Sequence, residues 1–355
     1  MCLRRSRRSL LAWYAQHARD LPWRRTKDPY CIWVSEIMLQ QTRVAAVVER
    51  YGVFIERFPT LLSLALARVE DVLTVWSGLG YYKRARMLHR AAQFVLWNHA
   101  GTLPRTAEEL RKLPGIGVYT AAAISSIAFH EPVAVVDGNV ERVLVRLLGP
   151  SPEGAPPTHA KVREVAQQLL SQDRPGDFNQ AMMELGATVC LPQGPLCAQC
   201  PVQAHCKTRG EHPVAKRRAI RSRPIAYALV CRTHGRSNKC KVLIRQRPQD
   251  AAQMPGMWEL PEIEERWIEA KEPVLRLRHA ITNTNHYVRI YALDELPETT
   301  QHDRQKQRWA EGMEMLEMPL TGLTRKVLMR LDILPRPKNV RIGAEIPATL
   351  DAFLI

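Results

Sequence analysis

Four of the eight cysteines lie in one short segment and have the spacing of a metal-binding site. Cys190, Cys197, Cys200 and Cys206 follow the pattern C-x6-C-x2-C-x5-C, so that four thiolates can surround one centre. A structural zinc ion and an iron–sulfur cluster both use four such ligands, and the ligand chemistry alone leaves both open. The other cysteines are scattered singly, as expected in a reducing compartment where disulfides are rare.

Two carboxylic acids lie in contrasting sequence environments. Glu36 lies in the apolar run 32–39, where burial would raise its pKa and let it hold a proton. Asp137 directly precedes a predicted helix at 140–148, whose N-terminus suits a negative charge. Such a pair can act as an acid and an anion, the combination that cleaves a glycosidic bond. A surface glutamate and a plain helix cap are the alternatives.

A glycine-rich turn offers a third chemical feature. Leu113-Pro-Gly115-Ile-Gly117 joins two predicted helices, and its glycines let the backbone turn N–H groups outward at a helix N-terminus. The turn is therefore a candidate phosphate-binding site, although turns of this kind more often only connect two helices.

The elements that position these residues change in type along the chain. Up to Cys206, apolar residues recur every three or four positions, which predicts an all-α domain over 1–206. The predicted helices include 10–18, 33–54, 69–76, 81–97, 120–129, 140–148 and 162–170, and Thr106 begins another with capping-box spacing. A basic linker is predicted at 207–224, an α+β domain at 225–338 and a tail at 339–355. In the α+β domain we expect strands at 225–231, 241–247, 274–281 and 287–293 and a helix at 320–331.

The charge of the chain indicates a polyanionic partner. Its 51 Lys and Arg exceed its 35 Asp and Glu by 16, and most of this excess lies in residues 1–30 and 207–224. No apolar run approaches the roughly 18 residues of a membrane span, and the stretch after the N-terminal arginines is too polar for an export signal. We expect a cytoplasmic protein that binds nucleic acid and no membrane, nucleoid-associated in a bacterium.

Five motifs in order resemble the adenine DNA glycosylases (MutY family) of the helix-hairpin-helix, endonuclease III-like superfamily. They are Trp33-Val-Ser-Glu-Ile-Met-Leu-Gln-Gln-Thr42, Gly78-Leu-Gly-Tyr-Tyr82, the turn 113–117, Val136-Asp-Gly-Asn-Val140 and the cysteine loop 190–206. The resemblance covers 10–206 densely. It implies a helix-hairpin-helix domain with a 4Fe-4S cluster on the four cysteines. It also implies a monomeric enzyme that flips adenine out of double-stranded DNA and excises it opposite 8-oxoguanine or guanine.

The resemblance also assigns catalytic roles. Glu36 would protonate adenine at N7, Asp137 would stabilise the sugar cation or a covalent intermediate, and Asn139 would orient the carboxylates. Tyr119 occupies the position of the Schiff-base lysine of the lyase relatives, so strong lyase activity is not expected. Its hydroxyl resembles one that hydrogen-bonds the catalytic aspartate in some members.

Other expected contacts are carried over in the same way. The adenine pocket would include Trp23, Arg24, Leu39 and Gln180. The expected DNA contacts are the wedge residues Gln41 and Tyr82 and the turn residues Leu113, Gly115 and Gly117.

Residues 225–335 more weakly resemble the Nudix-like domain with which this family reads 8-oxoguanine. Gly256 to Glu262 keeps the opening of a Nudix box, but the second half is missing, so pyrophosphate hydrolysis is not expected. Alignment on Arg278-His279 places Thr282 and Asn283 where the lesion is read.

Two other functions stay open at this point. One is a mismatch-specific thymine or uracil DNA glycosylase, against which Gln180, Arg24 and the large C-terminal domain argue. The other is a non-catalytic DNA-binding iron–sulfur protein, which would not need both Glu36 and Asp137.

Overall fold

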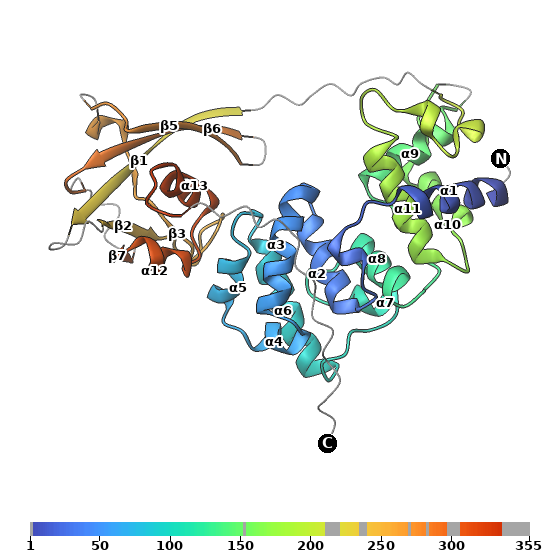
Figure 1. Cartoon of the computed structure of the whole chain (residues 1–355), viewed down its shortest axis with the longest axis horizontal. Helices are drawn as coiled ribbons and strands as arrows, with labels where there is room; N and C mark the ends of the chain where they lie inside the picture. The colour runs from blue at the N-terminus through green and yellow to red at the C-terminus, as the bar shows by residue number, and fades with distance from the viewer. Residues whose placement is uncertain are drawn as a thin grey trace.

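The computed structural model describes residues 3–151, 154–209, 221–233, 240–268, 271–281, 284–296 and 306–335. Within these ranges residues 3–209 are helical and residues 221–335 are built on a sheet (Figure 1). This confirms the predicted order of an all-α part followed by an α+β part. None of the described helices is long and apolar enough to cross a bilayer.

The helical domain contains eleven described α-helices and three short 3₁₀ turns. They are α1 (Leu3–His17), η1 (Pro22–Arg24), α2 (Pro29–Leu39), α3 (Val44–Arg57), α4 (Leu61–Leu66), α5 (Val69–Val75), α6 (Lys83–Asn98), α7 (Ala107–Leu110), α8 (Val118–Ala128), α9 (Gly138–Leu148), α10 (His159–Leu169), α11 (Pro175–Thr188), η2 (Cys197–Gln199) and η3 (Gln203–His205).

Side-chain caps explain where several helices begin. Asp28 accepts from the backbone N–H of Tyr30 and starts α2, and Thr106 accepts from Glu109 and starts α7. The helix predicted over 33–54 is instead two helices, because the chain turns at 40–43 between α2 and α3. No glycine or proline marks this turn in the sequence.

Two hydrophobic cores divide the helical domain into lobes. The first packs elements from η1 to α8 around Trp33, Phe54 and Trp76. The second packs α1 against α9, α10 and α11 around Leu10 and Leu144. The first helix of the chain therefore completes a lobe whose other elements lie beyond residue 137, as Figure 1 shows on the right.

The C-terminal domain is a mixed sheet with two described α-helices, α12 (Gly312–Leu316) and α13 (Gly322–Arg330), and one 3₁₀ turn, η4 (Glu265–Trp267). Its main path has the order β3-β2-β1-β6-β5; β4 pairs with β1, β7 pairs with β2, and β1 and β6 are parallel. The strands are β1 (Arg221–Thr233), β2 (Cys240–Gln246), β3 (Trp258–Glu259), β4 (Glu262–Ile263), β5 (Leu275–Ile281), β6 (Thr284–Leu293) and β7 (Gln307–Ala310).

The linker predicted at 207–224 is too long at its C-terminal end. Strand β1 starts at Arg221, because residues 221–224 already pair with 284–287 of β6. Residues 210–220 of the linker and the tail predicted at 339–355 lie outside the described residues.

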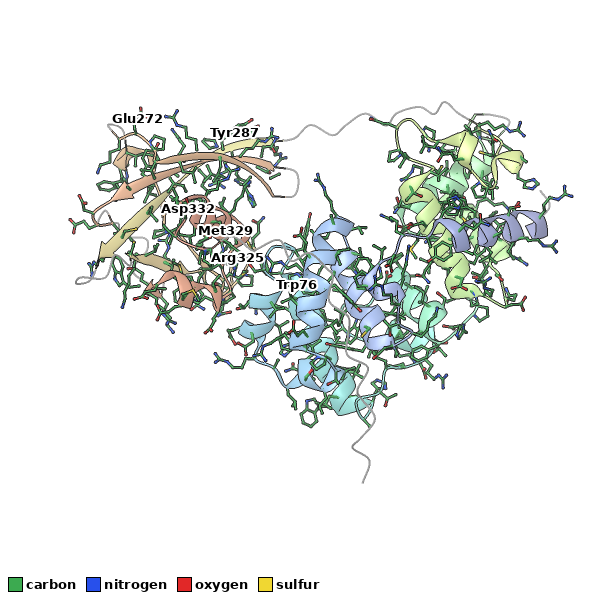
Figure 2. The ribbon with its side chains drawn as sticks, viewed as in Figure 1. Trp76, Glu272, Tyr287, Arg325, Met329 and Asp332 are labelled. Atoms are coloured by element: carbon green, nitrogen blue, oxygen red, sulfur yellow. The ribbon has the colours of Figure 1, made fainter. Side chains whose placement is uncertain are left out.

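The sheet domain packs directly on the helical domain near α5 and α6. Met257 is fully buried in the first helical core, and Arg86 donates to the carbonyl of Pro255 at 2.6 Å. Arg325 of α13 donates to Ser77 Oγ at 2.7 Å. Figure 2 shows Arg325 on the side of the sheet domain that faces Trp76. The interface thus combines apolar burial with buried hydrogen bonds.

Candidate active site

A cavity of about 770 Å³ lies where the two lobes meet, lined by residues of both. Most of the residues predicted for catalysis and binding line it. These are Trp23, Arg24, Glu36, Leu39, Gln41, Gly115, Gly117, Tyr119, Asp137, Asn139 and Gln180.

Glu36 lies on α2 and is 5% exposed. Burial raises its pKa to about 7, and the nearby Asp137 adds to the rise. The Tyr119 hydroxyl, which donates to Glu36 Oε2 at 2.8 Å, and the positive charge of Arg24 act in the opposite direction. The predicted burial of Glu36 and the predicted rise of its pKa are confirmed. A carboxyl group of this kind is partly protonated at neutral pH.

Asp137 caps α9, as predicted, because its Oδ1 accepts from the backbone N–H of Val140 at 2.7 Å. Its second oxygen accepts from Asn139 Nδ2 at 2.9 Å. Asn139 is held in turn by Arg142, which also donates to the carbonyl of Cys190 at 2.9 Å. A continuous set of hydrogen bonds therefore runs from the cysteine loop to the Asp137 carboxylate.

The hydroxyl of Tyr119 has a different partner from the one that the resemblance implied. It donates to Glu36 and not to the aspartate, and it also contacts Met183 Sδ at 3.3 Å. Both oxygens of Asp137 already accept other hydrogen bonds, whereas Glu36 lies buried nearby. Burial raises the pKa of Tyr119 well above its ordinary value, so the phenol stays a donor.

Sequence reasoning missed the role of Glu184, which anchors one wall of the cavity. Its side chain is fully buried and accepts from Arg19 Nε at 2.7 Å and Arg24 Nη2 at 2.8 Å. Burial alone would raise the pKa of Glu184, but these hydrogen bonds lower it to about 2. The signal was available: Glu184 follows Gln180 by one helical turn, which places both on one face of α11.

Apolar side chains and the Gln180 amide also line the cavity. Trp23 is 7% exposed, and its ring meets that of Tyr51 edge-on with the ring centres 5.6 Å apart. Leu39 packs against the first hydrophobic core. Gln180 is buried and lines the cavity. A planar apolar ligand with polar edges suits such a cavity.

The two predicted wedge residues lie in different places. Gln41 is exposed and lines the cavity. Tyr82 is 3% exposed, and its hydroxyl donates to the carbonyl of Leu320 in the sheet domain at 3.2 Å. Its neighbour Tyr81 is 44% exposed. Because a wedge must be free to enter DNA, the burial of Tyr82 disagrees with the predicted role of this residue.

The glycine-rich turn is formed, but its two glycines differ. Gly115 has φ +77°, and a Cβ there would lie 2.8 Å from Cβ of Met87, so both conformation and space require glycine. Gly117 is extended and begins α8. Leu113 is 2% exposed and packs in the first core, so its contribution is structural in this conformation.

The four clustered cysteines line a second cavity, of about 30 Å³, between α9 and the end of α11. Arg146 donates to Cys190 Sγ at 3.3 Å, and the Cys206 thiol donates to the carbonyl of Arg146 at 3.4 Å. Burial raises the pKa of Cys200 to about 11, and the charges of the three other cysteines contribute to the rise. In the ranges that the structure describes, no three or more His, Cys, Asp or Glu side chains are arranged to ligate one metal ion.

Thr282 and Asn283, predicted to read the lesion, lie outside the described residues. Their neighbours Ile281 and Thr284 are paired at the end of β5 and β6.

Comparison with known proteins identifies a domain of the chain. Residues 34–172 match the HhH-GPD superfamily base excision DNA repair protein model, so this part of the chain is an HhH-GPD domain. Among its relatives are adenine DNA glycosylases. The chain is 53% identical over 212 residues to the enzyme of Rattus norvegicus, and the alignment covers 57% of this chain and 41% of that protein. It is 52% identical over 216 residues to that of Homo sapiens, covering 57% and 39%.

The chain thus spans less than half the length of these two relatives. A solved structure of a thermostable thymine-DNA glycosylase is also similar, with 29% identity and a TM-score of 0.54. That match covers 59% of this chain and 99% of the other.

Proposed function

We propose that this protein is an adenine DNA glycosylase of base excision repair, which hydrolyses the N-glycosidic bond of adenine opposite 8-oxoguanine or guanine in duplex DNA. The observation that carries the proposal is that two acids line one cavity: the buried, protonatable Glu36 and Asp137, whose carboxylate caps helix α9. The identity to adenine DNA glycosylases supports the choice of base.

The two carboxyl groups divide the chemistry. Glu36 transfers its proton to a ring nitrogen of adenine, which makes the base a better leaving group, and the bond between C1′ and N9 breaks. The Asp137 carboxylate offsets the positive charge that develops on the sugar. Water then adds to C1′ and returns a proton to Glu36. Tyr119 offers no amine to C1′, so the product is an intact strand with an abasic site.

Other side chains that line the cavity support recognition of the extruded base. Trp23 gives a face for stacking, and the Gln180 amide can pair with a purine edge. Glu184 holds Arg19 and Arg24 in place through its two hydrogen-bonded oxygens. Gln41 and Tyr81 are the proposed wedges that fill the space the adenine leaves.

For the cysteine loop we propose a 4Fe-4S cluster bound by Cys190, Cys197, Cys200 and Cys206. In support, all four thiols line one cavity, and the Arg146 guanidinium beside Cys190 offsets negative charge on thiolate ligands. Purified protein should be brown, with broad visible absorbance and about four irons per chain. One zinc and no iron would refute the assignment.

For the sheet domain we propose a Nudix-like fold that reads 8-oxoguanine through Thr282 and Asn283. The mixed sheet of this domain and the antiparallel pairing of β5 with β6 support the proposal. The variant T282A/N283A should reduce the preference for 8-oxoguanine over guanine by ~1 to 3 kcal/mol. If the variant keeps the wild-type ratio of excision rates opposite 8-oxoguanine and guanine, other residues recognise the lesion.

One assay tests the main proposal against its nearest rival. Duplexes carrying A opposite 8-oxoguanine, A opposite G, or T opposite G are incubated with excess protein and then cleaved with alkali at abasic sites. We expect scission at adenine in the first two and none at thymine. Scission only in the T:G duplex would indicate a thymine glycosylase, and no scission in any duplex would indicate a non-catalytic protein.

A further inference from the structure

Two turns, the first of which lines the cavity, each contain a non-glycine residue in the left-handed backbone conformation. The turn after α2 contains Gln41 with φ +54°, and the turn before α6 contains Tyr81 with φ +48°. Non-glycine residues rarely adopt this conformation, so surrounding contacts must hold it. Both side chains are exposed. These are the two proposed wedge residues.

One guanidinium, that of Arg84, binds both turns. From α6 it donates to the end of α2 and to the turn that follows, and also to the turn that contains Tyr81. The acceptors in the first group are the carbonyls of Ile37 and Met38, each at 2.9 Å, the carbonyl of Gln40, and Thr42 Oγ1 at 2.9 Å. Those in the second are the carbonyls of Leu79 at 3.1 Å and Gly80 at 3.2 Å.

Aromatic contacts fix the same side chain. The Arg84 guanidinium lies 5.5 Å from the ring centre of Trp76 and 5.4 Å from that of Tyr81. Burial lowers the pKa of Arg84 to about 10, so it stays charged at neutral pH. The charge is therefore kept, and the four N–H groups of Nη1 and Nη2 are shared among the six acceptors.

The position of these acceptors links the turns to the acid. Ile37 and Met38 directly follow Glu36, and their carbonyls lie at the end of α2, where a helix leaves backbone acceptors unpaired. Arg84 binds these carbonyls. The end of the acid-bearing helix and both wedge turns thus share one anchor.

We propose that Arg84 is a positioning residue that fixes Gln41 and Tyr81 in position relative to Glu36. When these two wedge residues enter the DNA, the extruded base is then delivered to the acid. The inference rests on the proposed function. It assigns Arg84 a role in base extrusion beyond stabilising the fold, and it requires no contact between Arg84 and DNA.

The test uses the full chain and a duplex with 2-aminopurine at the target adenine, opposite 8-oxoguanine, because its fluorescence rises when it leaves the stack. We expect R84Q to lose most of the fluorescence rise. Its single-turnover rate of adenine excision should fall at least ~10-fold, because the base would no longer be held in the geometry in which it reacts. Binding to a duplex with tetrahydrofuran at the target position should change less than ~3-fold, since no base must be extruded. R84K should be intermediate, because an ammonium reaches only some of the acceptors.

Arg86 provides the matched control. It lies on α6 and is also partly buried, and its Nη2 donates to the carbonyl of Pro255 in the sheet domain. R86Q should keep the fluorescence rise of the wild type. A wild-type fluorescence rise in R84Q overturns the inference, as does an equal loss in R86Q. Failure of the proposed function is distinguishable, because then the wild-type chain itself would excise no adenine.

Discussion

Glu36 should determine how the reaction depends on pH. With a pKa of about 7, the acid is protonated below neutral pH and loses its proton above it, so the single-turnover excision rate should fall as pH rises past 7. Glu36→Gln should lose a factor of ~100 or more at every pH while DNA affinity is kept. The exposed Glu49 of α3 gives the control variant Glu49→Gln, which should excise normally. Near wild-type excision by Glu36→Gln would remove Glu36 from the mechanism.

The same shift affects stability. The folded-state pKa of Glu36 lies above its ordinary value of 4.5, so ionising this group lowers stability as pH rises from about 4.5 through 7. Glu36→Gln should therefore raise the free energy of unfolding by about 3 kcal/mol at pH 8 and by much less at pH 4.5. Urea denaturation at the two pH values measures the difference.

Tyr119 should tune the pKa of this acid. Its hydrogen bond lowers the pKa of Glu36, so Tyr119→Phe should raise that pKa and move the alkaline fall in excision rate to higher pH. Tyr30→Phe is the control: Tyr30 is also on α2, but its hydroxyl donates to the carbonyl of Phe58. A pH profile of Tyr119→Phe that is unchanged or moved to lower pH would contradict the assignment.

At the scale of elements, the close approach of α9 and α11 should control Asp137. A Cβ on Gly186 of α11 would lie 2.6 Å from Cβ of Asn139, the residue that holds the Asp137 carboxylate. Gly186→Ala should therefore destabilise the protein by about 1 to 3 kcal/mol and slow excision at least ~10-fold.

Gly52 of α3 offers the comparison, because nothing lies within 4 Å of a Cβ built there. Gly52→Ala should leave excision unchanged and stabilise its helix by up to ~1 kcal/mol. If Gly186→Ala behaves like Gly52→Ala, the approach of the two helices does not position Asn139.

Features that depend on residues close together in the chain could be predicted from the sequence, whereas features that depend on distant residues could not. The burial of Glu36 and the capping role of Asp137 depend on residues nearby in the chain, and both were predicted. The break between α2 and α3 depends on Arg84, which lies more than 40 residues away, so periodicity alone extended one helix through it. The choice between Tyr81 and Tyr82 likewise depends on which side chain faces the sheet domain.

At the scale of the whole molecule, the hydrogen bond between Arg325 and Ser77 should couple the two domains. Arg325 is 8% exposed, and a buried charged donor of this kind contributes about 1.5 to 3 kcal/mol. In urea unfolding, Arg325→Ala and Ser77→Ala should be non-additive by at least ~0.5 kcal/mol. The exposed Arg330 on the same helix is the control, and Arg330→Ala should be additive with Ser77→Ala. Additivity in the first pair would mean that the contact does not stabilise docking.

The discontinuous second lobe sets an order of assembly on the ribosome. The core around Trp33 and Trp76 draws on helices that are complete by residue 135, apart from Met257. The lobe that α1 completes needs partners up to residue 206, so the first helix must wait, with Leu10 exposed, until nearly 200 further residues have emerged. Glu36 therefore occupies a folded lobe before Asp137 is in place. Until those partners have emerged, the apolar face of α1 stays exposed, and this is the interval in which a chaperone is most needed.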